Sequence, residues 1–218
     1  MDMKKIFSFV VLALLSIFGA VNANAQLNWG VLGGATFSSA KPSEWKNSEC
    51  TQYHAGATLK ISLPLGFAVQ PSVLYQVKGS QINETDFGEA FKYISGFVEV
   101  PVSVQWGPDL LIMRPYFECV PFVGYALHNA YKAPSAIAKN NWKGINRWEY
   151  GLGLGAGVEV WHFQISARYN WNFGALMDSA QLDDSLDDFP ERMNYVLGSK
   201  KNKKYNFGGV TLSLAVLF

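Results

Sequence analysis

The stretch FQISARYNWNF, from Phe163 to Phe173, decides the fold class. Its odd-numbered positions are all aromatic or aliphatic, and its even-numbered positions are all polar. Successive side chains of a β-strand point to opposite faces, so this period of two predicts a strand with one apolar and one polar face.

Seven further segments carry the same alternation. They are residues 27–38, 53–63, 67–77, 94–106, 116–128, 147–160 and 205–218. Each is long enough for a tilted strand to cross a bilayer, which takes about 9–11 residues. The connections between them alternate in length. The short ones are 64–66, 107–114 and 161–162, and the long ones are 39–52, 80–91, 129–146 and 174–204.

Short turns at one end and long loops at the other are typical of outer-membrane barrels. The sequence therefore predicts an all-β protein, an eight-stranded up-and-down antiparallel transmembrane β-barrel. Closure into a barrel also removes exposed strand edges. A secreted barrel of the lipocalin kind is the soluble alternative, with the apolar face turned inward. The wholly polar second face argues against it.

The N-terminus predicts export. Lys4 and Lys5 precede an apolar run from Ile6 to Val21, and Ala23-Asn24-Ala25 follows. This order is typical of a cleaved secretory signal, and the run is short for a membrane anchor, which needs roughly 20 apolar residues. We expect a cleaved signal peptide at 1–25, a barrel domain at 26–218, and the outer membrane of a Gram-negative bacterium as the location.

Removing 25 of the 218 residues leaves 193, with 16 basic and 16 acidic side chains. A neutral chain is a poor partner for nucleic acid. Residues 26–218 contain no apolar segment long enough for a membrane helix. Cys50 falls in a predicted loop and Cys119 in the middle of a predicted strand, so we expect both to be free thiols.

The polar faces of the strands would line the lumen. Alternation places seven charged residues there: Lys60, Lys78, Glu99, Glu118, Glu149, Glu159 and Arg168. Buried charges persist when they are paired, and the interior of eight strands is narrow. We expect a closed, mutually neutralising plug, with Arg168 at its centre paired with Glu99, Glu118 or Glu159. The alternative is that some of these groups are hydrated and the protein is a small channel.

The apolar faces would contact lipid, with aromatic side chains near the strand ends as at other membrane interfaces. These are Trp29, Phe37, Tyr53, Phe67, Tyr75, Trp106, Trp148, Trp171 and Phe218. The final apolar alternation resembles the signal read by the barrel-assembly machinery, which we expect as a partner during biogenesis. Its residues are Leu212, Leu214, Val216 and Phe218.

No cofactor or metal is expected. Gly151 to Gly157 has glycines at every second position of a strand, whereas a dinucleotide fingerprint needs a turn between strand and helix. The histidines are His54, His128 and His162, without an HExxH or paired-Cys motif. A lipid-modifying hydrolase using His54 or His128 with a nearby Ser is the less favoured alternative. We expect no enzymatic activity.

The last long loop is the expected partner-binding segment, because loops on rigid barrels usually carry function. It holds acids and bases in two runs: Asp183, Asp184, Asp187, Asp188, then Lys200, Lys201, Lys203, Lys204. The acids do not follow an EF-hand spacing. A solvated charged face is the plain alternative. Lipopolysaccharide, outer-membrane lipids or a protein are the candidate partners.

Three features resemble the PorT-like outer-membrane β-barrel family and, more broadly, small OmpA-type barrels. They are Val98-Glu99-Val100-Pro101-Val102, Arg114-Pro115-Tyr116, and the Gly-rich strand followed by Phe163 to Tyr169. The resemblance covers nearly all of residues 26–218 and brings no catalytic signature. It implies a structural or interaction role, which in some PorT-like members is tied to protein secretion.

Overall fold

The computed structural model describes residues 26–41, 47–82, 91–133, 136–139, 147–173, 177–178 and 204–218. Side chains are described outside 38–50, 80–93, 130–146 and 174–207. The expected signal peptide lies outside the described residues. Within them, no helix combines the length and the apolar character needed to cross a membrane.

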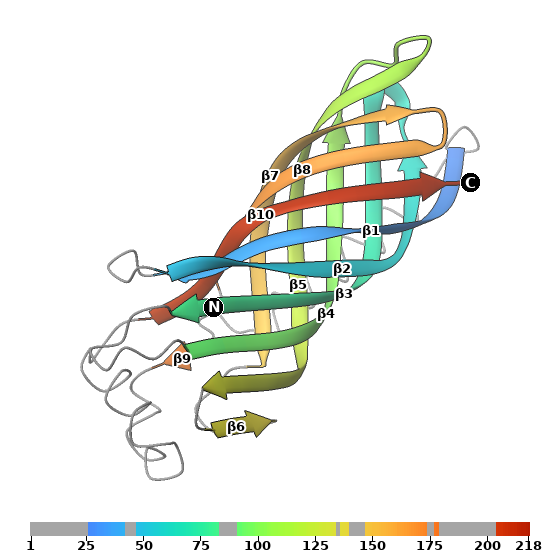
Figure 1. Ribbon diagram of the computed structural model, residues 1–218. Helices are drawn as coiled ribbons and strands as arrows, with labels where there is room; N and C mark the ends of the chain where they lie inside the picture. Colours follow the sequence, from blue (N-terminus) through green and yellow to red (C-terminus); the bar gives the residue numbers. More distant parts are fainter. Residues whose placement is uncertain are drawn as a thin grey trace.

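The described chain is built almost entirely of strands (Figure 1). The eight wall strands are β1 (Gln26–Lys41), β2 (Asn47–Ser62), β3 (Phe67–Ile82), β4 (Phe91–Trp106), β5 (Met113–Ala133), β7 (Trp148–Val160), β8 (Phe163–Asn172) and β10 (Lys204–Leu217). Two short strands, β6 (Ala136–Lys139) and β9 (Met177–Asp178), pair with β5 and β10. A single 3-10 turn, Pro64–Gly66, joins β2 to β3.

The wall strands follow one another around a closed ring. Their order is β1-β2-β3-β4-β5-β7-β8-β10, every pairing among them is antiparallel, and β10 pairs back with β1. The closing ladder runs from Gly30↔Leu217 to Lys41↔Asn206. The predicted eight-stranded up-and-down antiparallel barrel is confirmed.

Several predicted strand ends were wrong, and every error of more than one residue made the predicted strand too short. Residues 39–52 were expected to form a loop, but β1 continues to Lys41 and β2 begins at Asn47. Cys50 therefore lies in a strand, opposite Ser38 in the register. Likewise β3 and β5 continue to Ile82 and Ala133. Lipid-driven alternation stops at the membrane edge, whereas backbone pairing needs no apolar face and goes on beyond it.

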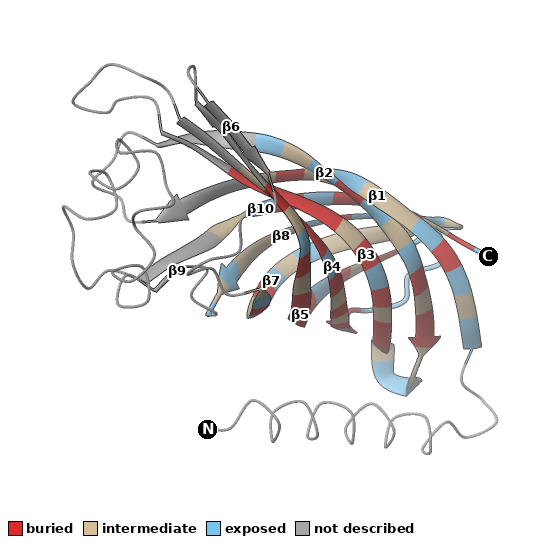
Figure 2. Ribbon diagram, turned by 90° about the horizontal axis from the view of Figure 1, so that it is seen from below, coloured by how far each residue is buried: buried red, intermediate tan, exposed pale blue. Residues whose placement is uncertain are grey.

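The two faces of the wall differ as the alternation predicts (Figure 2). Along β8, Phe163 and Ile165 are exposed on the outside, while Gln164 and Ser166 are buried inside. The same holds around the ring, so the buried interior is rich in polar side chains and the exposed wall is apolar. This inside-out distribution suits a barrel whose solvent on the outside is lipid.

Candidate functional site

The inward-facing polar side chains make a continuous network across the lumen. The alternation of β3 and β4 puts Gln70, Lys78, Glu99 and Gln105 on the inner face, all nearly inaccessible to solvent. Because no water can replace their lost hydration, each must find partners within the lumen. Three groups of ion pairs and a row of amides provide them.

The first group surrounds the ammonium of Lys78. Its Nζ lies 2.8 Å from Glu99 Oε2 and 2.8 Å from Glu149 Oε1. Asn172 Nδ2 donates to the other oxygen of Glu149 at 2.7 Å. The rings of Phe97 and Phe122 face the same ammonium, with centroids 5.4 and 4.9 Å from Nζ. Lys78 thus ties β3 to β4 and β7, with aromatic rings shielding the charge.

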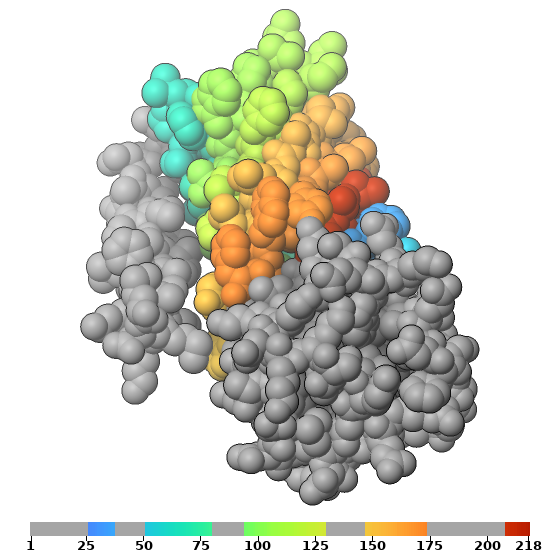
Figure 3. Space-filling model, turned by 90° about the vertical axis from the view of Figure 1, so that its left-hand side faces the viewer, coloured from blue at the N-terminus to red at the C-terminus, as the bar shows by residue number. Residues whose placement is uncertain are grey.

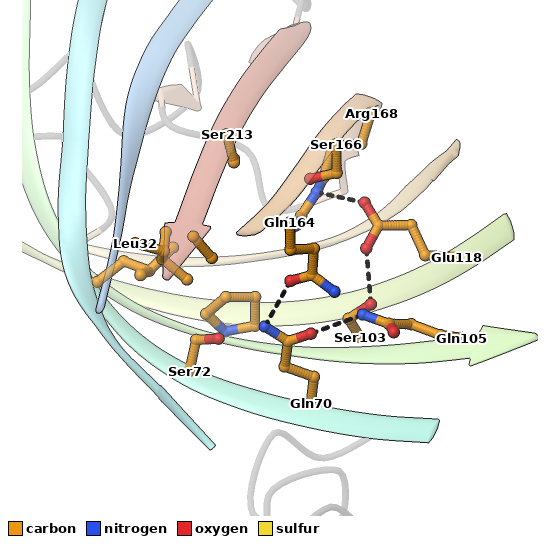
Figure 4. A pocket seen from close by; sticks show the side chains of 13 residues that line it. Leu32, Gln70, Ser72, Ser103, Gln105, Glu118, Gln164, Ser166, Arg168 and Ser213 are labelled. Atoms are coloured by element: carbon orange, nitrogen blue, oxygen red, sulfur yellow. Dashed lines mark hydrogen bonds and ion pairs between the residues drawn. The ribbon is translucent and has the colours of Figure 1, made fainter. Parts of the chain in front are cut away.

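The second group is centred on Glu118. Arg168 Nε lies 3.1 Å from Glu118 Oε1, and Ser103 Oγ donates to Glu118 Oε2 at 2.6 Å. Figure 4 shows these contacts on one side of the lumen. Gly155 on β7 lets β8 approach closely, because an added Cβ would lie 2.4 Å from Ala167 O and 2.7 Å from Arg168 Cβ. The glycines of β7 accordingly serve packing inside a strand.

The third group spans the lumen near the short turns. Lys60 Nζ donates to Glu159 Oε1 at 2.6 Å. Arg114 Nη1 lies 3.7 Å from Glu159 Oε2, and Arg114 Nε lies 3.1 Å from Asp109 Oδ1. Lys60 is almost fully buried and Glu159 is largely buried, so water screens this pair weakly.

A row of amides runs beside the third group. Arg114 Nη1 donates to Gln105 Oε1 at 3.1 Å, Gln105 Nε2 to Gln70 Oε1 at 2.7 Å, and Gln70 Nε2 to Gln164 Oε1 at 3.0 Å. A cavity of about 20 Å³ lies against this row and Glu118 (Figure 4), with room for about one water molecule. At this level, side chains from β3 and β8 meet across the lumen.

The structure brings all seven predicted lumen residues into ion pairs, and it adds an eighth. Arg114 was assigned to the connection 107–114, yet it is buried at the start of β5. Its alternation with Tyr116 and Glu118 was the signal that could have placed it inside. With Arg114 the described lumen holds four bases and four acids, so its formal charge is zero.

His54 is buried inside the barrel. Its ring bridges two hydroxyls, with Nδ1 3.1 Å from Thr36 Oγ1 and Nε2 2.9 Å from Ser213 Oγ. A Ser-His pair therefore exists, but a threonine occupies the place of the orienting acid. His128 stacks on Tyr75 on the outer face, with ring centroids 6.1 Å apart. His162 lies in the β7–β8 turn and contacts Leu217 O.

Other predicted sites fall outside the network. Cys119 is exposed on the outer wall as a free thiol, and nothing is described of the Cys50 side chain. The loop acids at 183–188 and the lysines at 200–203 lie outside the described residues, and for Lys204 only the backbone of β10 is described. Among the described residues, no cluster of His, Cys, Asp or Glu is arranged to hold a metal ion.

Comparison with known proteins gives one sequence-level match. Residues 22–178 match the family model described as outer membrane protein beta-barrel domain. The search of curated proteins gives no match. Among solved structures, Neisserial surface protein A (NspA) is similar, with 13% identity and a TM-score of 0.44. That alignment covers 87% of this chain and 97% of NspA.

Two further solved structures are similar at the same level. One is Ail, the attachment invasion locus protein of Yersinia pestis, in complex with the heparin analogue sucrose octasulfate. It is 12% identical with a TM-score of 0.44, and 88% of this chain and 99% of that one are covered. The other is a major outer membrane protein from Thermus thermophilus, 14% identical with a TM-score of 0.42, covering 88% and 99%.

Proposed function

The chain belongs to the outer membrane protein β-barrel domain family, and on that premise we propose that it acts as a closed, non-conducting barrel that binds a partner at its external end. The proposal has two parts. The lumen is a structural plug, and the binding residues are carried on the long connections between strands.

The observation that supports a closed lumen is a pair of contacts across the full width of the barrel. In the ring of eight strands, β2 and β7 are four positions apart in either direction, and so are β3 and β8. Lys60 on β2 reaches Glu159 on β7, and Gln70 on β3 reaches Gln164 on β8. Side chains that meet from opposite walls leave no continuous path between them.

The balance of charge supports the same reading. A conducting pore needs charges that are hydrated and accessible to ions. Here Lys78, Glu99 and Glu149 satisfy one another and are almost inaccessible to solvent. Opening this group would leave buried charges without partners, which costs several kcal/mol.

The test is the conductance of the refolded protein in a planar bilayer, with heat-modifiable gel mobility as the control for folding. We expect folded protein without steady conductance. The double variant Gln70→Gly with Gln164→Gly removes the hydrogen bond that joins β3 to β8 across the lumen, so it should raise the conductance. Val73→Ala, on the outer face of β3, should leave the conductance unchanged. Steady conductance of the unmodified protein would move the small-channel alternative to first place.

The partner is proposed to be a protein that meets the loop between β8 and β10, through its acidic run and its lysines. Because the chain resembles PorT-like barrels, we propose further that this protein partner is a component of protein secretion. Replacing residues 179–203 by a short Gly-Ser linker should abolish cross-linked species formed in cells with the folded barrel. A variant that only exchanges Asp183 and Asp184 for Asn should weaken them. Unchanged cross-linking of the linker variant would refute binding at this loop.

No catalytic role is proposed for His54 and Ser213. The pair lies within the packed lumen, where a lipid substrate has no access, and Thr36 cannot stabilise an imidazolium as a carboxylate does. These three residues join β1, β2 and β10, the strands at the closure of the barrel. Their arrangement fits a structural role at that seam.

A further inference from the structure

The short turns at one end of the barrel carry large apolar side chains on strained backbone. Leu65 and Trp161 have φ of 65° and 55°, a left-handed conformation that glycine or asparagine adopts more easily. Their side chains are 88% and 79% exposed. Leucine and tryptophan at these positions cost conformational free energy, and burial within the fold does not compensate for it. This points to a use for the side chains outside the barrel.

The third turn of the same end repeats the pattern. Residues 107–112 join β4 to β5, and within them Leu110, Leu111 and Ile112 are exposed, Leu111 completely. Figure 3 shows this green turn standing free at the top of the molecule. The three turns join β2 to β3, β4 to β5 and β7 to β8, so they are spread around the circumference. Apolar side chains spread around the barrel rim are better placed to contact a flat lipid layer than a compact surface on one protein partner.

Several polar groups of these turns have partners within the barrel. Asp109 is the one acidic residue of 63–66, 107–112 and 161–162. Its side chain is 72% exposed, and its Oδ1 lies 3.1 Å from Arg114 Nε. Gly66 O accepts from Gly107 N at 3.0 Å and from Arg114 Nη2 at 2.9 Å. The carbonyl of His162 accepts from Leu217 N at 2.8 Å. Backbone near hydrocarbon must be satisfied in this way.

The height of the apolar outer wall brings the short turns to the edge of the lipid. On three strands the outward aromatic residues are eight positions apart: Trp29 and Phe37, Phe67 and Tyr75, Phe117 and Tyr125. At about 3.3 Å per residue and a tilt near 40°, this spacing is roughly 20 Å. The apolar band of an outer-membrane barrel is about 25 Å tall. Leu65 lies two positions before Phe67, in the turn that follows this aromatic level, and therefore at the edge of the apolar band.

We propose that the short turns are seated in the inner, phospholipid leaflet of the outer membrane, with Leu65, Leu111 and Trp161 as anchors. Short turns mark the periplasmic end of outer-membrane barrels. With no lysine or arginine in the three turns, the fitting surface is a zwitterionic phospholipid such as phosphatidylethanolamine. This end of the barrel is therefore a lipid contact and offers no platform for a periplasmic protein.

The test places a fluorophore at residue 111. The full chain carrying Leu111→Cys, Cys50→Ser and Cys119→Ser is labelled with an environment-sensitive dye and refolded into phosphatidylethanolamine-phosphatidylcholine vesicles. Quenching by a lipid with a doxyl group near the headgroup should exceed quenching by aqueous iodide severalfold. The Cys50→Ser chain labelled at the exposed wall residue Cys119 gives the reference for full embedding. Strong iodide quenching at residue 111 without lipid quenching would overturn the proposal.

A second measurement does not depend on the label. Leu65→Asn relieves the left-handed backbone but removes the apolar side chain, whereas Leu65→Met keeps an apolar side chain. If the turn is anchored in lipid, the urea midpoint in vesicles falls for Leu65→Asn and is preserved for Leu65→Met. If Leu65→Asn is as stable as the unmodified chain or more stable, backbone strain outweighs lipid contact and the anchor is refuted.

Discussion

Lys60 and Glu159 stand on opposite strands of the ring, and Lys60 Nζ lies 2.6 Å from Glu159 Oε1. The pair therefore crosslinks two walls that share no backbone hydrogen bonds. Removing one member of a buried pair costs about 3–5 kcal/mol, because the other charge is left without its partner. Here Arg114 remains 3.7 Å from Glu159 and can take part of that charge.

Lys60→Met should accordingly lower the free energy of unfolding in detergent micelles by about 3 kcal/mol, at the lower end of the range for a broken buried pair. The double variant with Glu159→Met should lose less than the sum of the two single variants, because no charge is left unpaired. Urea titration followed by gel mobility measures both. Strict additivity would show that the contact contributes nothing.

Arg168→Leu should lower the thermal unfolding midpoint markedly, because Glu118 then keeps only the hydroxyl of Ser103 as a described partner for its charge. We expect a loss of about 3–5 kcal/mol. Adding Glu118→Gln to Arg168→Leu removes the stranded charge and should restore part of the midpoint. An unchanged midpoint for Arg168→Leu would mean that the group is hydrated.

Gly155→Ala should destabilise the barrel by about 1–3 kcal/mol through crowding, because the new Cβ would lie 2.4 Å from Ala167 O and 2.7 Å from Arg168 Cβ. Gly33→Ala is the matched control. Gly33 points outward, and its nearest neighbour would lie at 3.4 Å, so this change should be close to neutral. Equal effects of the two variants would contradict the view that the glycines of β7 make room inside the lumen.

Ser213→Ala should cost about 1–3 kcal/mol, because His54 Nε2 loses its buried partner. Hydrolysis of phospholipid or lipopolysaccharide acyl esters should stay at background for both the unmodified and the variant protein. Activity above background that disappears in Ser213→Ala would establish the hydrolase alternative. A midpoint that does not change would show that the bond to His54 is replaced by water.

Much of the fold could be predicted because lipid imposes a strict period of two on a membrane strand. Phe163 to Phe173 fixed the faces of β8, and the same reasoning placed Lys60 and Glu99 inside the barrel. The period fails where the lipid ends, so the sequence predicts a loop at residues 39–52, although most of these residues continue β1 and β2.

The pairing of charges was harder to predict than their location. Which acid meets Arg168 depends on the register of strands that are not neighbours in sequence, and three candidates were left open. Arg114 was missed because it follows a turn with its own apolar residues, where the alternation has only begun. Partners such as Gln70 and Gln164 lie 94 residues apart in sequence, a separation that no local pattern reports.

The lengths of β3, β4 and β5 have a mechanical consequence. Their ladders continue past the aromatic residues Tyr75 and Tyr125 to Ile82↔Phe91 and Lys92↔Lys132. From Tyr125 to Ala133, β5 covers eight further residues, about 25 Å of strand. β2 joins this extension through Asn47↔Ile82, and β6 joins it through Ala133↔Ala136. A five-stranded stalk thus continues beyond the aromatic residues with its backbone already paired. A ligand that binds at the end of this stalk loses little of its binding free energy to ordering the chain. A force applied to that ligand acts directly on the barrel wall, which the ion pairs of the lumen hold together.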